Sequence, residues 1–299
     1  MGTASVAEAA AILLGASSGR LIQEKKIFYP NSDECGAVTI ALVELSNSFA
    51  PHKGELHLIG SGPGDLKMLT NDSRQALTRC AAWIGYGPYL NHLESIRRHD
   101  QVRVDSELTF EKDRCQYALD LAKEGAKVSL ISSGDSGIYG MAGLALELWL
   151  NERVDSRPLF QVHPGISSFQ MAAAKLGAPL MNDFCSVSLS DLLTPWNQIE
   201  IRIRNAAIGD FVIAVFNPKS IKRDWQLIKT VDLLLKFRKP STPVAIARQL
   251  GRPEESIEIC TLGTLPFDKV DMFTILVIGN SQSFIESNKF LTPRGYFSN

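Results

Sequence analysis

Residues 55–65, "ELHLIGSGPGD", decide the fold class that this sequence predicts. A short apolar run leads into three glycines at alternate positions, Gly60, Gly62 and Gly64, and the stretch ends in an aspartate. Such a pattern is typical of a buried strand that turns tightly into a helix, the first unit of an α/β sheet. Some α/β proteins bind a phosphate at this turn, so the residues of the turn decide what it can hold.

The turn is a poor site for a phosphate. A P-loop has a lysine and a hydroxyl residue after its last glycine, whereas Asp65 and Leu66 follow Gly64. A dinucleotide fingerprint needs a glycine where Asp65 stands, and Pro63 removes one backbone donor. The turn therefore presents a carboxylate at its rim, and the alternative is a purely structural turn with a solvated aspartate.

Two further strand ends carry the same kind of motif. "SSGDSGIYGMAG" (132–143) and "HPGISSFQMAAAKLG" (163–177) each follow an apolar run and each lead into a predicted helix. Ligands bind beyond the carboxyl ends of the strands in α/β sheets, so we expect all three turns to face one crevice. Their polar, neutral to acidic residues suit an adenosine linked to a sulfonium and do not suit a triphosphate.

Strands alternate with helices from residue 54 onward, which predicts a parallel sheet covered by helices. We expect an N-terminal α/β subdomain over 54–153 and a C-terminal α/β subdomain over 154–299, with a joint near "ERVDSRP" (152–158). Residues 1–45 predict a helix, a short strand over 20–29 and an apolar run over 37–45, too little chain for a stable domain. A linker is expected over 46–53, where serine, asparagine, proline and glycine are mixed.

Composition excludes several classes of function. The formal net charge is −1, so no basic field indicates nucleic acid or an anionic membrane. The five cysteines are far apart and the five histidines lack metal-ligand spacing, so neither a zinc site nor a disulfide framework is predicted. No apolar run approaches about 18 residues, and we expect a cytoplasmic protein without a protein-bound metal.

Taken together, the motifs resemble those of a known family. "GSGPGD", "SSGDSGIYGMAGLALEL", "HPGISSFQMAAAKLGAPLMNDFCSVSLSDLLTPW", "FNPKS" and "TPRGY" are similar to the tetrapyrrole (corrin/porphyrin) methyltransferases, from about Gly54 to Tyr296. The resemblance implies an α/β two-domain tetrapyrrole methylase fold, an active-site cleft between the domains, a homodimer, and S-adenosylmethionine as methyl donor. "SLSDLLTPW" with "TPRGY" further implies methylation of carbon 17 of precorrin-3B or its cobalt-loaded counterpart, coupled to corrin ring contraction in cobalamin biosynthesis.

Residues 1–45 carry a second resemblance. "SVAEAAAILLGASSGRLIQEKK" and "GAVTIAL" are similar to the C-terminal end of cobalt-precorrin-5A hydrolase. The resemblance implies a remnant of a fused hydrolase in a longer protein, and most of that hydrolase is missing. It also favours a cobalt-loaded substrate, because the hydrolase belongs to the route that uses cobalt.

The family resemblance also implies a set of site residues. The residues expected to bind the methyl donor are Pro63, Asp135, Gly137, Ile138, Ser167, Ser168, Phe216, Asn217, Ala247 and Thr274. The residues expected to contact the tetrapyrrole are Gly62, Gly64, Asp65, Tyr139, Met141 and Arg248. Ring contraction requires protons to move, and Asp65 is the first candidate acid or base, followed by His163. Structural alternatives are a helix cap for Asp135 and a turn residue for His163.

Three other functions stay open at this stage. A sibling methyltransferase would act on another ring carbon, and a carrier would bind the tetrapyrrole without turning it over. A nicotinamide-dependent oxidoreductase is disfavoured, because the sixth position of its glycine fingerprint is occupied by Asp65.

Overall fold

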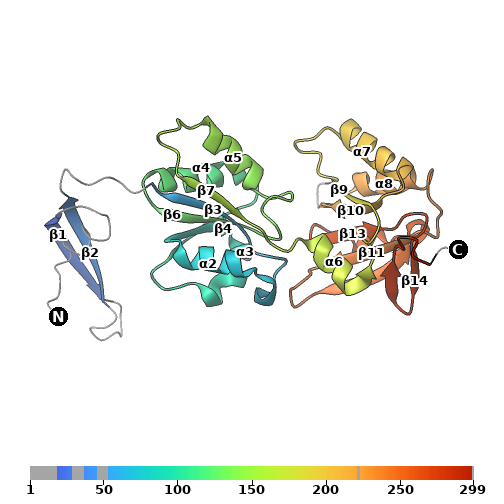
Figure 1. Ribbon diagram of the computed structural model, residues 1–299, viewed down its shortest axis with the longest axis horizontal. Helices are drawn as coiled ribbons and strands as arrows, with labels where there is room; N and C mark the ends of the chain where they lie inside the picture. Colours follow the sequence, from blue (N-terminus) through green and yellow to red (C-terminus); the bar gives the residue numbers. More distant parts are fainter. Residues whose placement is uncertain (1–18, 29–36, 46–52, 221–222, 298–299) are drawn as a thin grey trace.

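The structure is a computed structural model, and it describes residues 19–28, 37–45, 53–220 and 223–297. Within these ranges, the strand predicted over 20–29 and the apolar run that follows it form an antiparallel hairpin of β1 (Gly19–Phe28) and β2 (Ala37–Leu45). The helix expected at the start of the chain and all but one residue of the 46–53 linker lie outside the described residues. Two larger lobes follow, each built around its own sheet (Figure 1).

The first lobe contains a five-stranded parallel sheet in the order β5-β4-β6-β3-β7. Its strands are β3 (Glu55–Gly60), β4 (Ala82–Tyr86), β5 (Val102–Ser106), β6 (Lys127–Ser132) and β7 (Leu159–His163). The central strands are buried on both faces, which explains their nearly continuous apolar sequence. The parallel α/β sheet predicted from the alternating pattern is confirmed.

Helices cover both faces of this sheet (Figure 1). On one face lie α2 (Asn71–Arg79), α3 (Gly87–Leu93) and two short 3₁₀ turns, η2 (Leu66–Met68) and η3 (Glu94–Ile96). On the other face α4 (Glu111–Lys123) and α5 (Ala142–Asn151) pack together. The predicted end of α4 is confirmed, since Gly125 follows it with φ 99°, a conformation that favours glycine.

The boundary expected between residues 153 and 154 is wrong. Strand β7 pairs in parallel with β3, from Leu159 opposite Glu55 to His163 opposite Ile59. Residues 152–158 therefore form a loop inside the first lobe, and the chain passes to the second lobe after His163. A charged, proline-containing stretch has the composition of any surface loop, and that composition does not distinguish a loop within a lobe from a joint between lobes.

The second lobe contains a mixed five-stranded sheet in the order β12-β11-β13-β10-β9. Its strands are β9 (Phe184–Ser188), β10 (Val212–Phe216), β11 (Pro243–Arg248), β12 (Ser256–Thr261) and β13 (Thr274–Ile278). Only β9 and β10 pair in parallel, and β13 runs antiparallel between β10 and β11.

Two layers enclose this second sheet. Helices α7 (Trp196–Ile208) and α8 (Trp225–Leu234) cover one face. The other face is covered by α6 (Ser168–Leu176) and carries the fully buried Phe290. Phe290 belongs to a small sheet of β8 (Gly177–Ala178), β14 (Phe284–Glu286) and β15 (Lys289–Leu291), and two 3₁₀ turns, η4 (Leu262–Thr264) and η5 (Phe267–Lys269), complete the lobe.

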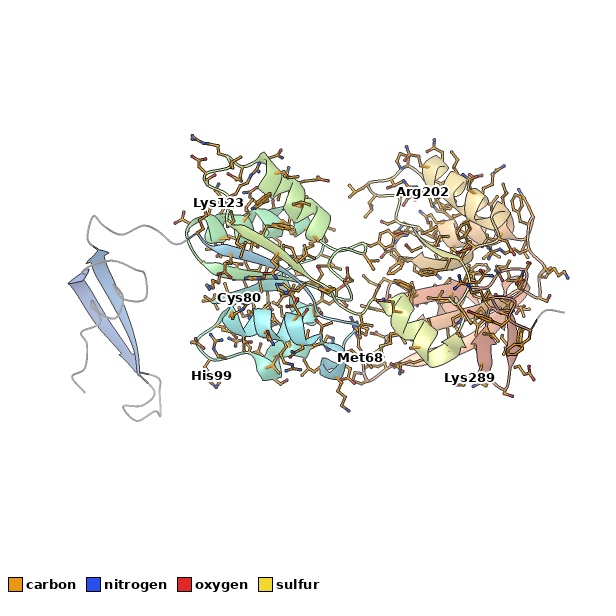
Figure 2. All side chains as sticks on the ribbon, viewed as in Figure 1. Met68, Cys80, His99, Lys123, Arg202 and Lys289 are labelled. Carbon is orange, nitrogen blue, oxygen red and sulfur yellow. The ribbon has the colours of Figure 1, made fainter. Side chains whose placement is uncertain are left out.

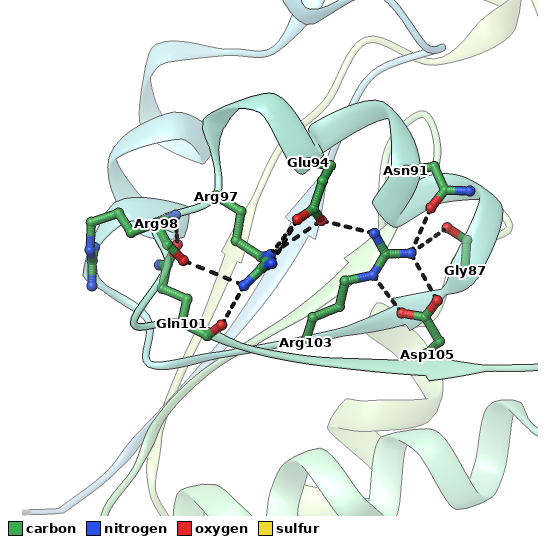
Figure 3. A network of polar contacts seen from close by, with 8 residues as sticks. All are labelled: Gly87, Asn91, Glu94, Arg97, Arg98, Gln101, Arg103 and Asp105. Atoms are coloured by element: carbon green, nitrogen blue, oxygen red, sulfur yellow. Dashed lines mark hydrogen bonds and ion pairs between the residues drawn. The ribbon is translucent and has the colours of Figure 1, made fainter. Parts of the chain in front are cut away.

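Side chains fill both lobes, and Met68 of the first lobe lies on the side facing the second (Figure 2). Met68 packs against the apolar cluster of the second lobe, so the two lobes touch directly. In the first lobe, an ion network around Glu94 and Arg103 fastens the edge strand β5 (Figure 3). None of the described helices has the length and apolarity needed to cross a membrane.

Candidate active site

The three glycine-containing strand ends meet at one corner of the first lobe, as the sequence predicts. Gly62 and Gly134 exchange backbone hydrogen bonds of 3.0 and 2.7 Å. A Cβ on Gly165 would lie 2.1 Å from the Gly134 carbonyl oxygen, and one on Gly60 would lie 2.5 Å from the Gly165 nitrogen. Such close approach of backbone to backbone is possible only for glycine. The ends of β3, β6 and β7 therefore form one corner.

Asp135 fastens two of these turns together. Its Oδ1 accepts a hydrogen bond from the Gly137 amide at 2.8 Å, and its Oδ2 accepts one from the Gly165 amide at 2.9 Å. Helix α5 starts at Ala142, and the residue at its N-cap is Met141, so Asp135 is not a helix cap. Hydrogen bonds to an ionised acceptor are about twice as strong as neutral ones, which makes Asp135 the clamp between the β6 and β7 turns.

A cleft that is open to solvent runs between the two lobes beside this corner. The residues that line it are Pro63, Tyr89, Ser133, Gly134, Asp135, Ile138, Tyr139, Ser167, Ser168, Phe216, Asn217, Ala247, Gln249, Leu250, Arg252, Met272, Phe273, Thr274 and Ile275. Asp135 and Arg252 are the charged side chains of this lining. The lining is otherwise neutral, with polar groups beside apolar and aromatic surface, the usual make-up of a small-molecule site.

The structure brings the expected donor-site residues together in this cleft, with one exception. Gly137 is not part of the lining, but its amide takes part through the hydrogen bond to Asp135. Ser167 lines the cleft and also caps α6, because its side chain and that of Gln170 form a reciprocal capping box. The serine thus serves both the helix and the cleft.

An aromatic pair spans the cleft. The ring of Tyr139, from the first lobe, lies 4.8 Å from that of Phe216 at the end of β10, measured between centroids. The Tyr139 hydroxyl also lies 3.4 Å from the Ser186 hydroxyl on β9. Tyr139, Asn217 and Gln249 all have positive φ, at 53°, 49° and 52°. Non-glycine residues held there cost about 1–3 kcal/mol each and cluster at functional sites.

The turn at 60–65 also reaches the second lobe. A Cβ on Gly64 would lie 2.9 Å from Cγ of Arg252 and 3.0 Å from the Gly251 carbonyl oxygen. Asp65 precedes η2 and accepts a hydrogen bond from the Lys67 amide at 2.9 Å. Asp65 does not belong to the cleft lining, and its role as acid or base stays a prediction.

Met141 and His163 lie away from the cleft. Met141 is buried in the core beneath α4 and α5, and its sulfur accepts a hydrogen bond from Arg114 at 3.3 Å. His163 is fully buried and bonds to His57 and Asp72 rather than to solvent. Both side chains point into the first lobe, so neither is placed to touch a ligand in the cleft. The sequence motifs do not show in which direction a side chain points, which is why both residues were expected at the site.

Arg248 lies at the end of β11 and is held by an acidic partner. Its Nε donates to Asp271 at 2.6 Å, and Thr274 in the cleft donates to the same carboxylate at 2.8 Å. Burial alone would raise the pKa of Asp271, but the hydrogen bonds from Arg248, Thr274 and the Phe273 amide outweigh it and lower that pKa. The carboxylate therefore stays charged and fixes this rim of the cleft.

Sequence reasoning missed the part of the lining that follows β11 and precedes β13. Gln249 and Arg252 flank Gly251, whose φ of 72° requires glycine, and Arg252 lies 5.4 Å over the Phe273 ring. The dipeptide "LG" (250–251) after an apolar strand was the available signal, a fourth strand end closing in a glycine turn. Within the described residues, no group of three or more His, Cys, Asp or Glu is arranged to hold a metal ion.

Comparisons with known proteins agree with this geometry. The model of the family described as Tetrapyrrole (Corrin/Porphyrin) Methylases matches residues 55–266. A probable cobalt-factor III C(17)-methyltransferase of Salmonella typhimurium is 42% identical over 241 residues, which cover 81% of this chain and 99% of that protein. A precorrin-3B C(17)-methyltransferase of Sinorhizobium sp is 38% identical over 254 residues, covering 81% and 97%.

A solved structure, that of the methyltransferase CobJ, superposes with a TM-score of 0.77 at 32% sequence identity, over 80% of this chain and 100% of that one. The two-lobed α/β architecture and the match of the family model over most of the chain lead to one conclusion. The chain belongs to the tetrapyrrole (corrin/porphyrin) methylases.

Proposed function

We propose that this protein transfers a methyl group from S-adenosylmethionine to carbon 17 of precorrin-3B or its cobalt-loaded counterpart, coupled to corrin ring contraction in cobalamin biosynthesis. The observation that carries the proposal is the cleft between the lobes, where glycine turns from the first lobe meet aromatic and polar residues from the second. The named relatives at 42% and 38% identity supply the reaction.

The lining fits the methyl donor. Ile138, Ala247 and Ile275 offer apolar surface to an adenine, and Asp135 is the carboxylate in the lining that could attract a cationic ligand. Ser167 is the N-cap of α6 and Ser168 its first residue, and a helix N-terminus suits a ligand carboxylate. S-adenosylmethionine supplies an activated methyl group on a positively charged sulfur. Holding that group in line with the acceptor carbon is the task of the chain, and such orientation is worth up to about 7–11 kcal/mol.

The substrate side of the site would be formed by Gly62, Gly64, Asp65, Tyr139 and Arg248. The substrate carries carboxylates, which guanidinium groups bind with bidentate geometry. Arg248 is not part of the cleft lining, but it is about half exposed and bonded to Asp271, and it is the candidate for that contact. Asp65, on the first turn, would move protons during ring contraction.

Of the two substrates, the cobalt-loaded one is our first choice. The more similar of the two relatives is named for cobalt-factor III. In this proposal the metal arrives inside the substrate. We also propose that the enzyme works in the cytoplasm as a homodimer, which light scattering would test, and that residues 1–45 are the remnant of a fused hydrolase.

The test is a methyl-transfer assay combined with calorimetric titration of S-adenosylhomocysteine. We expect binding, and a product heavier by one methyl group at carbon 17 with the cobalt-loaded substrate. Asp135→Asn keeps one acceptor oxygen and loses the other, so binding should weaken about tenfold or more. Asp155→Asn removes the same charge from an exposed ion pair and should bind normally.

The alternatives predict different results in the same assay. A methyl group on another ring carbon would identify a sibling enzyme. Corrinoid binding without S-adenosylhomocysteine binding would identify a carrier. Absence of both from a folded protein would refute the proposal.

A further inference from the structure

A line of four side chains crosses the first lobe beneath the turn that carries Gly165. Glu55 Oε2 lies 2.8 Å from His57 Nε2, and His57 Nδ1 lies 2.9 Å from His163 Nε2. His163 Nδ1 in turn lies 2.6 Å from Asp72 Oδ2. Both imidazoles are essentially inaccessible to solvent. The line therefore has three hydrogen bonds, with a carboxylate at each end and two buried imidazoles in the middle.

These three contacts need three protons. Two neutral imidazoles carry one N–H each, which is enough for two contacts only. If both imidazoles donate outward to the carboxylates, the two nitrogens between His57 and His163 face each other with lone pairs at 2.9 Å. A third proton shared by the imidazoles completes the line, and the two carboxylates balance its charge.

The surroundings show that the third proton does not sit on Glu55. Lys127 pairs with Glu55 at 2.8 Å, and burial, which alone would raise the pKa of Glu55, is outweighed by the bonds from Lys127 and His57, so that pKa is lowered. Glu55 is thus ionised. Burial lowers the pKa of His57, the hydrogen bond that His57 donates to Glu55 opposes this, and the charges of His163 and of Arg79 on α2 add to the lowering.

The remaining neighbour adds no charge. Cys80 follows α2 and is buried, and desolvation raises its pKa to about 12, so it is a neutral thiol. Burial and the charge of Arg79 favour the neutral form of His57, so the extra proton leaves as the pH rises.

Asp72 connects this line to the cleft. It lies on α2, next to two residues that hold the turn after His163: Thr70 and Ser73 donate hydroxyl hydrogen bonds to the Pro164 carbonyl at 3.1 and 3.2 Å. The next amide in the chain, that of Gly165, donates to Asp135 in the cleft. A change in the pairing of His163 therefore acts on the cleft through two residues of one turn.

We propose that His57 and His163 share one proton between Glu55 and Asp72, and that this proton fastens the turn that shapes the methyl-donor cleft. His163 is then a positioning residue, and donor affinity depends on pH. The inference rests on the proposed function only in naming the ligand, since the proton itself can be observed without one.

The sign of the pH effect follows from the proton count. At low pH the pair holds its extra proton and all three contacts are made. As the pH rises the proton leaves, the contact between the two imidazoles is lost, and the turn loosens. S-adenosylhomocysteine should then bind roughly five- to tenfold more weakly, the worth of about one buried hydrogen bond. Because burial lowers the pKa of His57, the change should fall on the acid side of the pH at which an exposed histidine titrates.

One substitution should abolish the pH dependence. In His57→Asn, the side-chain amide nitrogen takes the place of Nδ1 and donates permanently to His163, so no extra proton is needed. Asp72→Asn removes one balancing charge and should move the transition to lower pH. His99→Asn, at an exposed histidine, is the matched control and should keep the wild-type profile.

Two measurements test the proposal. ¹⁵N spectra of histidine-labelled protein, assigned with these variants, should show an imidazolium shared by His57 and His163 that titrates as one unit. Calorimetry with S-adenosylhomocysteine across the same pH range should show the affinity change in wild type and a flat profile in His57→Asn. Two neutral imidazoles throughout, or equal profiles for wild type and His57→Asn, would overturn the inference. A wild type that binds no S-adenosylhomocysteine would instead refute the proposed function, while the spectra would still decide on the proton.

Discussion

Replacement of Gly165 by alanine tests the corner at which the three strand ends meet. The new Cβ would lie 2.1 Å from the Gly134 carbonyl oxygen and 2.7 Å from the Gly60 carbonyl carbon. Both neighbours are backbone atoms, so no side chain can rotate away to make room. The turns after β3, β6 and β7 would have to separate by roughly 1 Å, in an interior packed like a crystal.

The magnitude follows from the nature of the clash. Overpacking of a well-packed site costs about 1–3 kcal/mol, and contacts with two rigid backbones place Gly165→Ala at about the upper value. For a protein of this size, 3 kcal/mol corresponds to a fall in Tm of roughly 6–12 °C. Because the Gly165 amide would also move away from Asp135, we expect binding of S-adenosylhomocysteine to weaken at least tenfold.

The assay is thermal unfolding followed by calorimetric titration, with Gly143→Ala as the matched control. A Cβ on Gly143 meets nothing within 4 Å, and the residue lies in α5. That variant should keep its affinity and gain up to about 1 kcal/mol, because alanine is the better helix former. If Gly165→Ala and Gly143→Ala unfold and bind alike, the corner is not as tight as described and the argument for convergent glycine turns is refuted.

Further predictions concern stability, thiol reactivity and binding. Hydrogen bonds from two arginines lower the pKa of Glu94 to about 2, so its contribution to folding stability is complete above the usual value of 4.5 and is lost as the pH falls towards 2. In denaturation experiments, Glu94→Gln should be less stable than wild type above 4.5, and the difference should shrink as the pH falls towards 2. Burial raises the pKa of Cys80 and Cys115 to about 12, so both should resist alkylation at about pH 8 until the protein unfolds, as mass spectrometry would show. Tyr139→Ala removes the aromatic contact with Phe216, worth about 0.5–1.5 kcal/mol, and calorimetry should show about two- to tenfold weaker donor binding, whereas Tyr139→Phe should bind almost normally because the hydroxyl contact is long.

Local sequence was sufficient to predict most of the strands and helices of the first lobe. The runs that become β3 and β6 are apolar, end at glycines and are followed by helical periodicity, and each of these signals acts within about ten residues. Assigning β7 to the first sheet required information that its local sequence does not contain. Its sequence does not say which sheet it joins, and the pairing with β3 joins residues about one hundred positions apart. The boundary between the lobes was misplaced for that reason.

The residues of the candidate site also divide into those that local sequence predicts and those that only the folded sheet brings to the cleft. Asp135 and Ser167 were expected because each lies in a motif that can be read from neighbouring residues. Gln249 and Arg252 reach the cleft only because β11 lies beside β13 in the second sheet. The positive φ of Tyr139 is equally invisible in a sequence, since tyrosine has no preference for it and tertiary contacts impose it.

His57 and His163 show how far apart such contributions can lie. In the sequence they are 106 residues apart, and each stands in an apolar strand, where a lone histidine signals nothing in particular. The parallel pairing of β3 with β7 puts both on the face covered by α2, and α2 supplies Asp72. The turns that shape the cleft thus depend on a buried charge balance that only the folded sheet assembles. Burying the two imidazoles would be costly if they were unpaired, and the contacts from Glu55 to Asp72 offset that cost.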